Sequence, residues 1–256
     1  MLISQVAHVV RHLVLQVPPL ANYFLKIENE DEDDFSKEYR RLIRHYWSDD
    51  TEEINPKKLL QCVQSRFKQF EGCDQQDAQE VLMCMFEMFD KSLVKQIFRG
   101  QTIQETICKS GRSHLTEEFY SMVMYPTKDC SVLEALEDRQ NYSTIENYTD
   151  AKGETHHVSV SRTMFWTLPR ILVLSFQGRH RIKITHELSL GIHPDAPKNQ
   201  KVTRTLCALI RHQGSFRGGH YTSFTNHRGV WYYKDDTLVS PTNPPEEDYY
   251  YLAIYK

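Results

Sequence analysis

Two side chains able to support nucleophilic catalysis lie close together near the C-terminal end of the sequence. His220 follows a glycine-rich segment, Gly214-Ser-Phe-Arg-Gly-Gly219, and Asp235 ends the aromatic run that begins at Trp231. A histidine and a carboxylate on neighbouring strands can act as a base and the group that orients it. The pattern therefore predicts a His–Asp pair, with Asp236 directly beside the carboxylate.

Two apolar-rich runs must position this pair. Residues 206–212 and 219–225 read as two strands, and the glycines between them permit a positive φ and the close approach of another backbone. We expect segment 214–219 to form the loop that joins the two strands. His220 then lies where this loop re-enters the second strand.

The rest of the chain divides into a helical first part and a strand-rich second part. Helical spacing is predicted over residues 3–16, 35–46 and 75–93, with a short apolar turn at 20–25 after Pro18-Pro19. Another helix is predicted to begin at residues 55–60, with Asn55 as its N-cap and Pro56 as its first residue. The predicted apolar stripe of the helix at 75–93 is Val81, Leu82, Met85, Phe86 and Phe89. From residue 101 the period changes to two, and strands are predicted at 101–108, 117–124, 155–168, 170–176, 181–185 and 249–255, with one short helix at 131–139. Helices followed by antiparallel strands indicate an α+β fold, which we assign to one domain spanning residues 1–256.

The composition excludes several classes of protein. With 256 residues, 40% of them hydrophobic, the chain can bury a sizeable core, and its net charge of −3 gives no sign of a nucleic-acid partner. Arg11 and His12 interrupt the apolar N-terminal segment, so neither a membrane span nor a signal peptide is predicted. Six scattered cysteines without a Cys-x-x-Cys pair indicate a reducing, intracellular location, in the cytoplasm or the nucleus.

Several segments resemble, in order, the ubiquitin-specific protease family of deubiquitinases. Gly218-Gly-His-Tyr221 with Trp231 and Asp235-Asp236 resembles the histidine box of that family. Gln75-Gln-Asp-Ala-Gln-Glu-Val-Leu82 resembles its Gln-Gln-Asp helix start, with Gln79 and Val81 as departures. Further similar segments are Ile97-Phe-Arg-Gly100, Trp166 to Leu174 and the closing Tyr-Leu-Ala-Ile-Tyr. Ordered matches of this kind are more specific than any single motif.

The resemblance implies a papain-like right-hand architecture with a helical thumb (about 1–95), β fingers and part of a palm (about 96–165), and the remaining palm (about 166–256). By the same resemblance His220 is the general base and Asp235 its orienter, and ubiquitin places its C-terminal tail in the thumb–palm cleft. The residues expected to line that tail are Gln76, Asp77, Gly218, Gly219 and Tyr221. For Asp77, the first carboxylate of a predicted helix, a purely structural interpretation is equally open.

The sequence departs from the family where the nucleophile belongs. Counting back from Pro18-Pro-Leu20 places the family's cysteine at Gln5, or at Ser4 with a shift of one residue. Without a nucleophile the rate of such a triad falls by about 10⁴–10⁶. As written, the chain is therefore expected to be an inactive homologue that still recognises ubiquitin.

Two alternatives remain open. The chain could be an N-terminally truncated thiol protease that cleaves ubiquitin isopeptide bonds, or an interaction module of a protein complex that does not bind ubiquitin.

No cofactor and no metal are predicted. The two Cys-x-x-Cys pairs that often bind zinc in the fingers of the family are missing, and only Cys108 and Lys109-Ser-Gly111 are left of the first. His156 and His157 are adjacent in a predicted strand, so their side chains point to opposite faces.

Overall fold

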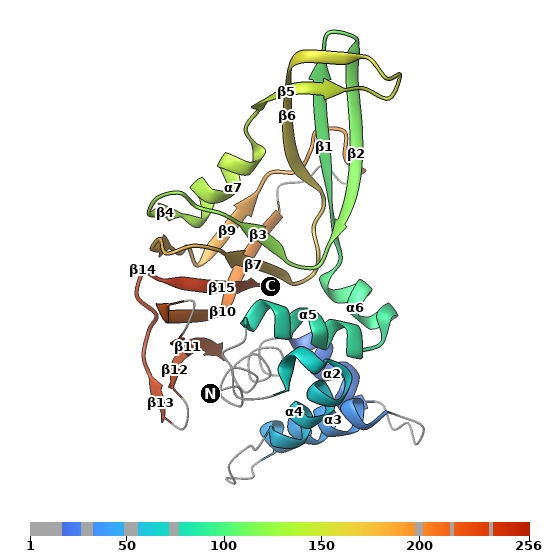
Figure 1. The fold of residues 1–256 in the computed structure, drawn as a ribbon. Helices are drawn as coiled ribbons and strands as arrows, with labels where there is room; N and C mark the ends of the chain where they lie inside the picture. Colours follow the sequence, from blue (N-terminus) through green and yellow to red (C-terminus); the bar gives the residue numbers. More distant parts are fainter. Residues whose placement is uncertain are drawn as a thin grey trace.

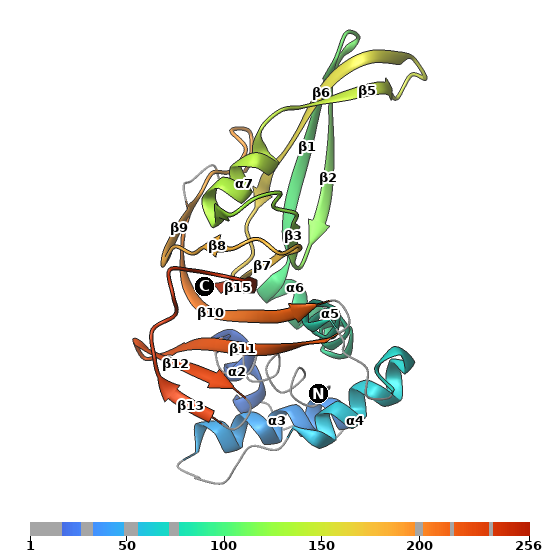
Figure 2. The same cartoon turned by 60° about the vertical axis from the view of Figure 1, so that its left-hand side comes forward.

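The computed structural model describes residues 17–26, 33–48, 56–71, 77–197, 202–215, 218–235 and 238–256. Most of its helices gather at one end of the molecule, a large sheet lies across the middle, and a long narrow sheet projects from the other end (Figure 1). Turning the molecule shows two helices, α3 (Asp34–Trp47) and α4 (Lys57–Arg66), running below the last strands of the large sheet (Figure 2). The arrangement is a mixture of helices and antiparallel sheet, and it confirms the predicted α+β class.

The helical end contains five α-helices and one 3₁₀ turn within the described residues: α2 (Pro18–Lys26), α3 (Asp34–Trp47), α4 (Lys57–Arg66), η1 (Lys68–Phe70), α5 (Ala78–Met88) and α6 (Lys91–Phe98). Three of them begin after an aspartate. The carboxylates of Asp33, Asp77 and Asp90 accept backbone N–H groups of the first turn of α3, α5 and α6. Such N-caps satisfy donors that the helix itself cannot pair.

Three helix predictions need correction. Residues 20–25 are part of the helix α2 rather than a turn, because Pro18 lacks only an N–H that the first turn of a helix leaves unpaired anyway. The predicted helix at 75–93 is two helices, since Asp90 caps a new one after Phe89. Pro56 is the N-cap of α4 and not its first residue. The predicted helix at 3–16 and the cap at Asn55 lie outside the described residues.

The central sheet has the strand order β13-β12-β11-β10-β15-β7-β3, with β9 pairing the far end of β10. All neighbours are antiparallel except β3 and β7. The strands are β3 (Met122–Met124), β7 (Leu172–Phe176), β9 (Glu187–Leu190), β10 (Val202–Ser215), β11 (Gly218–His227), β12 (Val230–Asp235), β13 (Leu238–Pro241) and β15 (Tyr250–Tyr255). A small sheet of β14 (Glu247–Asp248), β8 (Ile182–Lys183) and β4 (Cys130–Ser131) lies at its edge.

The projecting sheet has the order β2-β1-β6-β5, made of β1 (Gly100–Cys108), β2 (Gly111–Phe119), β5 (Ser143–Thr149) and β6 (Thr155–Thr167). We call it the extended sheet. The helix α7 (Val132–Gln140) follows β4 and begins with a capping box between Ser131 and Glu134. The predicted strand 117–124 is thus the end of β2 followed by β3, while β5, β9 and β13 were not predicted.

The two faces of the central sheet belong to two separate cores. Alternate residues of β7 and β15 face the helices, including Val173, Leu252 and Ile254, together with the predicted apolar stripe of α5. Their neighbours Leu174 and Ala253 pack on the other side with α7. The period of two along these strands therefore decides which layer each side chain joins. No helix of the described residues is long and apolar enough to cross a membrane.

Candidate functional site

The structure brings His220 and Asp235 into direct contact. Both lie on neighbouring strands, β11 and β12, and the Nε2 atom of His220 is 2.5 Å from Oδ1 of Asp235. Because a carboxylate can only accept, Nε2 donates, and this leaves Nδ1 as the nitrogen able to take a proton from another group. The two side chains remain 43% and 34% exposed, so a substrate can reach them.

A second contact holds the other oxygen of Asp235. The hydroxyl of Tyr233 donates to Oδ2 at 3.1 Å, and the guanidinium of Arg211 lies behind it, 3.4 Å from the same hydroxyl. Arg211 is fixed in turn by Asp248 at 2.9 Å. This support was not predicted, although Tyr233 and Asp235 are two residues apart in a strand and hence share a face.

The hairpin between β10 and β11 is tighter than predicted. Gly214 pairs with Gly219, and Ser215 with Gly218, so both strands extend into the segment that was expected to be a loop. Glycine is required at the two positions for different reasons. Gly214 has a φ of +137°, and a Cβ at Gly219 would lie 2.2 Å from Nε2 of His212. The predicted close approach at these glycines is therefore present.

Asp77 joins the helical end to the central sheet. Its Oδ1 accepts the backbone N–H groups of Gln79 at 2.7 Å and Glu80 at 3.2 Å, and its Oδ2 accepts the hydroxyl of Tyr251 on β15. The Nε2 amide of Gln177 donates to that same hydroxyl at 3.0 Å. The structural interpretation of Asp77 as an N-cap is thus correct, and the residue also lies between the two layers.

Aromatic rings surround this carboxylate. The ring of His212 packs on Tyr221 with a centroid distance of 4.4 Å, and Tyr251 closes the group at 5.9 Å from Tyr221. Burial raises the pKa of both tyrosines well above the usual value, with the nearby charge of Asp77 adding to it. Burial lowers the pKa of His212. These rings are neutral at physiological pH, so Asp77 supplies the charge in the group.

A cleft of about 530 Å³ opens beside these rings. Its wall includes His212, Gln213 and Gly214 of β10, Tyr249, and Tyr250 and Tyr251 of β15. Gln213 pairs with His220 across the hairpin, which places the His–Asp pair next to the cleft. Arg179 and His180 lie on another wall, and none of the described residues that line the cleft is acidic.

Comparison with known proteins decides the family. The family model described as ubiquitin carboxyl-terminal hydrolase matches residues 8–255. The chain belongs to this family.

Relatives and solved structures agree with that assignment. The ubiquitin carboxyl-terminal hydrolase Usp2 of Drosophila melanogaster is 23% identical over 261 residues, covering 79% of this chain and 28% of that protein. Human ubiquitin carboxyl-terminal hydrolase 15 is 26% identical over 127 residues, covering 44% of this chain and 13% of that protein. The chain thus spans well under a third of the length of these relatives.

Among solved structures, the SAGA Ubp8/Sgf11/Sus1/Sgf73 DUB module bound to monoubiquitin matches with a TM-score of 0.83 at 17% identity, over 98% of this chain and 66% of the matched one. The same module bound to ubiquitin aldehyde matches with a TM-score of 0.81, also at 17% identity, over 96% of this chain and 66% of that one. At this identity the likeness establishes the fold.

Several predicted site residues of this hydrolase-family domain lie outside the described residues, namely Ser4, Gln5, Gln76 and Asp236. For Gly218 only the backbone is described, as the partner of Ser215. Among the described cysteines, Cys207 shares the strand β10 with Gln213, the partner of His220. Cys207 is six residues along β10 from Gln213, roughly 20 Å at the rise of a strand. Its buried thiol donates to the carbonyl of Ile254, and burial raises its pKa to about 12.

The tip of the extended sheet has a polar group in place of the family's zinc ligands. Oδ2 of Asp150 accepts from Ser110 at 2.6 Å and lies 3.1 Å from Nε2 of His156, with Cys108 nearby. The hydrogen bond from Ser110, and next that of His156, hold the pKa of Asp150 far below its usual range. A four-thiolate zinc site does not fit here, because one cysteine remains and Ser110 and Gly111 take up its sulfur. The sequence missed this grouping of His156 with Asp150.

Proposed function

We propose that this domain recognises ubiquitin by binding its C-terminal tail in the cleft lined by β10 and by Tyr249 to Tyr251. The supporting observation is that the β10–β11 hairpin carries His220 of the His220–Asp235 pair and also lines the cleft, whose wall residue Tyr251 donates to Asp77. A slender tail suits a channel whose glycines have no side chain, and the charge of Asp77 suits a cationic tail. The family membership and the ubiquitin-bound proteins of similar fold support the same partner.

The hydrogen bonds of Asp77 determine which substitution tests this proposal. Replacing it by arginine would remove the N-cap of α5 and the bond to Tyr251, so lost binding could simply reflect misfolding. An asparagine at this position would be as good an N-cap as the aspartate while removing the charge, so Asp77→Asn is the cleaner substitution. Asp90→Asn is the matched control, because Asp90 caps α6 in the same way, through the N–H of Leu93 at 2.9 Å.

The experiment is a calorimetric titration of the chain with monoubiquitin. We expect wild type and Asp90→Asn to bind alike and Asp77→Asn to bind at least about tenfold more weakly, a loss of about 1.4 kcal/mol. Equal binding by Asp77→Asn would refute the placement of the tail. No heat from a folded wild-type chain at millimolar ubiquitin would reject ubiquitin recognition and favour the interaction module.

We further propose that the chain as written does not hydrolyse ubiquitin conjugates. The hydrogen bond between His220 and Asp235 would suit the activation of a thiol, but the sequence positions that match the family's cysteine hold Ser4 and Gln5. The competing hypothesis is a truncated active protease, and the retained pair favours it. Release of a fluorophore from the ubiquitin C-terminus distinguishes the two. We expect no turnover by wild type and detectable turnover by Gln5→Cys or Ser4→Cys; turnover by wild type that Asp235→Asn abolishes would refute inactivity.

A further inference from the structure

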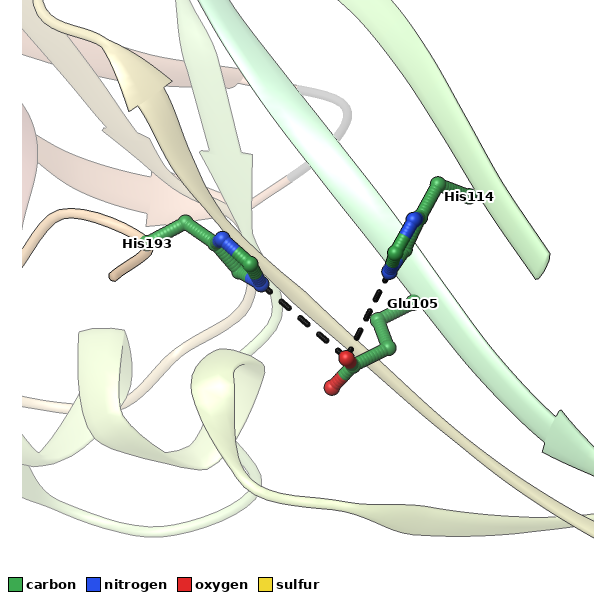
Figure 3. A group of neighbouring side chains, drawn as sticks. All are labelled: Glu105, His114 and His193. Carbon is green, nitrogen blue, oxygen red and sulfur yellow. Dashed lines mark hydrogen bonds and ion pairs between the residues drawn. The ribbon is translucent and has the colours of Figure 1, made fainter. Parts of the chain in front are cut away.

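A group of two histidines and a glutamate lies on the extended sheet, apart from the cleft and from the tip of that sheet. Glu105 of β1 and His114 of β2 are direct partners across the strand pair, and His193 reaches them from the segment that follows β9 (Figure 3). Glu105 and Cys108 are three residues apart, so their side chains point to opposite faces of β1. The group is therefore separate from the one around Asp150.

The three side chains converge on one point. Nε2 of His114 lies 3.5 Å and Nε2 of His193 lies 4.0 Å from Oε1 of Glu105, and all the ligand atoms lie within 4.8 Å of one another. A zinc ion bound at about 2.0–2.1 Å holds its ligand atoms roughly 3.3 Å apart. The group must therefore contract by about 1 Å or less along most of its edges. His114 is 42% exposed and has the freedom to turn inward.

The buried ring of His193 has a nitrogen without a hydrogen-bond partner among the described residues. Its side chain is 4% exposed, and its Nε2 atom has no hydrogen-bond partner although it is fully buried and faces Glu105. The backbone fixes this position, because the N–H of His193 donates to the carbonyl of Phe165 at 2.8 Å. Leaving a buried polar atom unpaired destabilises the fold, and a bound ion would give this nitrogen a partner.

The other ring nitrogen of His193, Nδ1, would change its hydrogen bond if a metal bound at Nε2. Nδ1 now accepts the backbone N–H of Asp195 at 3.2 Å, and a carboxylate oxygen of Asp195 lies 4.0 Å away. Binding of an ion at Nε2 would require the ring proton to be on Nδ1. The hydrogen bond from the N–H of Asp195 would then break, and the Asp195 carboxylate could turn to accept from Nδ1 in its place. A carboxylate on the second nitrogen is the usual support of a histidine ligand.

Two arginines compete for the same carboxylate. Arg162 donates to Oε2 of Glu105 at 2.8 Å, and Arg112 lies 2.9 Å from Oε1, the oxygen that faces both histidines. Arg112 is 55% exposed and can move into water, whereas Arg162 and the hydroxyl of Tyr142 would keep Oε2 in place. An ion would thus replace Arg112 on Oε1.

We propose that Glu105, His114 and His193 bind a divalent transition-metal ion, and that zinc is one such ion. Two imidazoles and a carboxylate form a zinc ligand set that keeps one position open. Bound there, the ion links the β1–β2 hairpin to the segment at 191–197. The site is independent of the proposed ubiquitin recognition, and it departs from the expectation of no metal, which rested on cysteine pairs and on His156-His157.

The test is a calorimetric titration of the full chain with zinc chloride, in a His156→Gln background that silences the group at the sheet tip. We expect His114→Gln to weaken binding at least about tenfold, the size of effect that even a supporting residue of a metal site has. His157→Gln, an exposed histidine of the same sheet, is the matched control and should bind as the background does. Arg112→Gln should bind zinc more tightly, because it frees Oε1 and removes a positive charge.

Two outcomes would overturn the proposal. One is the absence of zinc binding by a folded background chain at millimolar zinc. The other is binding that His114→Gln and Arg112→Gln leave unchanged. His193→Gln should also lose the site, but because that side chain is buried, the exposed His114 and Arg112 provide the decisive variants.

Discussion

The carboxylate of Glu105 allows a quantitative prediction about acid stability. Its side chain is 1% exposed and is held by Tyr142, Arg162 and Arg112. The hydrogen bond from Tyr142, then that from Arg162, lower its pKa to about 2 against the opposing effect of burial. Glu105→Gln keeps the shape of the side chain and removes the charge.

The magnitude follows from linkage between protonation and folding. The shift from an unfolded value near 4.5 corresponds to about 3 kcal/mol at 1.36 kcal/mol per unit. Arg112 and His114 remain about half exposed, so solvent screening reduces the expected contribution to roughly 1–2 kcal/mol. Because the folded pKa is the lower one, this contribution is complete above pH 4.5 and is lost as the pH falls toward 2.

Urea unfolding at several pH values measures this contribution. We expect Glu105→Gln to be less stable than wild type at pH 7 by at least this amount, with the difference shrinking between pH 5 and pH 3. Glu118→Gln is the control, since the exposed pair of Glu118 with Arg99 contributes at most about 1 kcal/mol. A constant difference between Glu105→Gln and wild type over this range would refute the assigned charge interaction.

Three further outcomes are expected. Tyr251→Phe should destabilise the chain by about 1–3 kcal/mol in urea unfolding, because it leaves an oxygen of Asp77 without its donor; an unchanged midpoint would contradict that bond. Gly219→Ala should cost about 1–3 kcal/mol, since its Cβ meets His212 at 2.2 Å, and full stability would show that the ring moves aside freely. At pH 8 the thiol of Cys207 should react with iodoacetamide only after unfolding. Labelling of Cys207 in the native chain, located by mass spectrometry, would contradict its burial.

The sequence was most informative where a single period dominates. Alternation at 101–108 and the apolar run at 170–176 became β1 and β7, and the apolar stripe of α5 is buried as predicted. The His–Asp pair could also be predicted, because two strands separated by a short turn must be neighbours. These features depend on local pattern or on short connections, which a sequence shows directly.

What the sequence did not reveal depends on long-range packing. The strands β5 and β13 are largely exposed and lack an apolar face, so no period marks them. The contact of Asp77 with Tyr251 joins residues 174 positions apart. His193 lies in a segment without periodicity, and its approach to Glu105 follows from the backbone bond to Phe165. None of these contacts has a signature within a window of a few residues.

The exposure of the His220–Asp235 pair indicates that its contribution to the stability of the fold is small. A hydrogen-bonded pair that is about 40% exposed contributes at most about 1 kcal/mol to stability, so the fold does not depend on it. Yet Tyr233 donates to the second carboxylate oxygen, Arg211 donates to Tyr233, and Asp248 accepts from Arg211, which is more support than a surface contact needs. Such support orients a base toward a reacting group. We therefore expect the pair to activate a thiol placed beside it, and turnover by Gln5→Cys or Ser4→Cys would show that the thiol is what this sequence lacks.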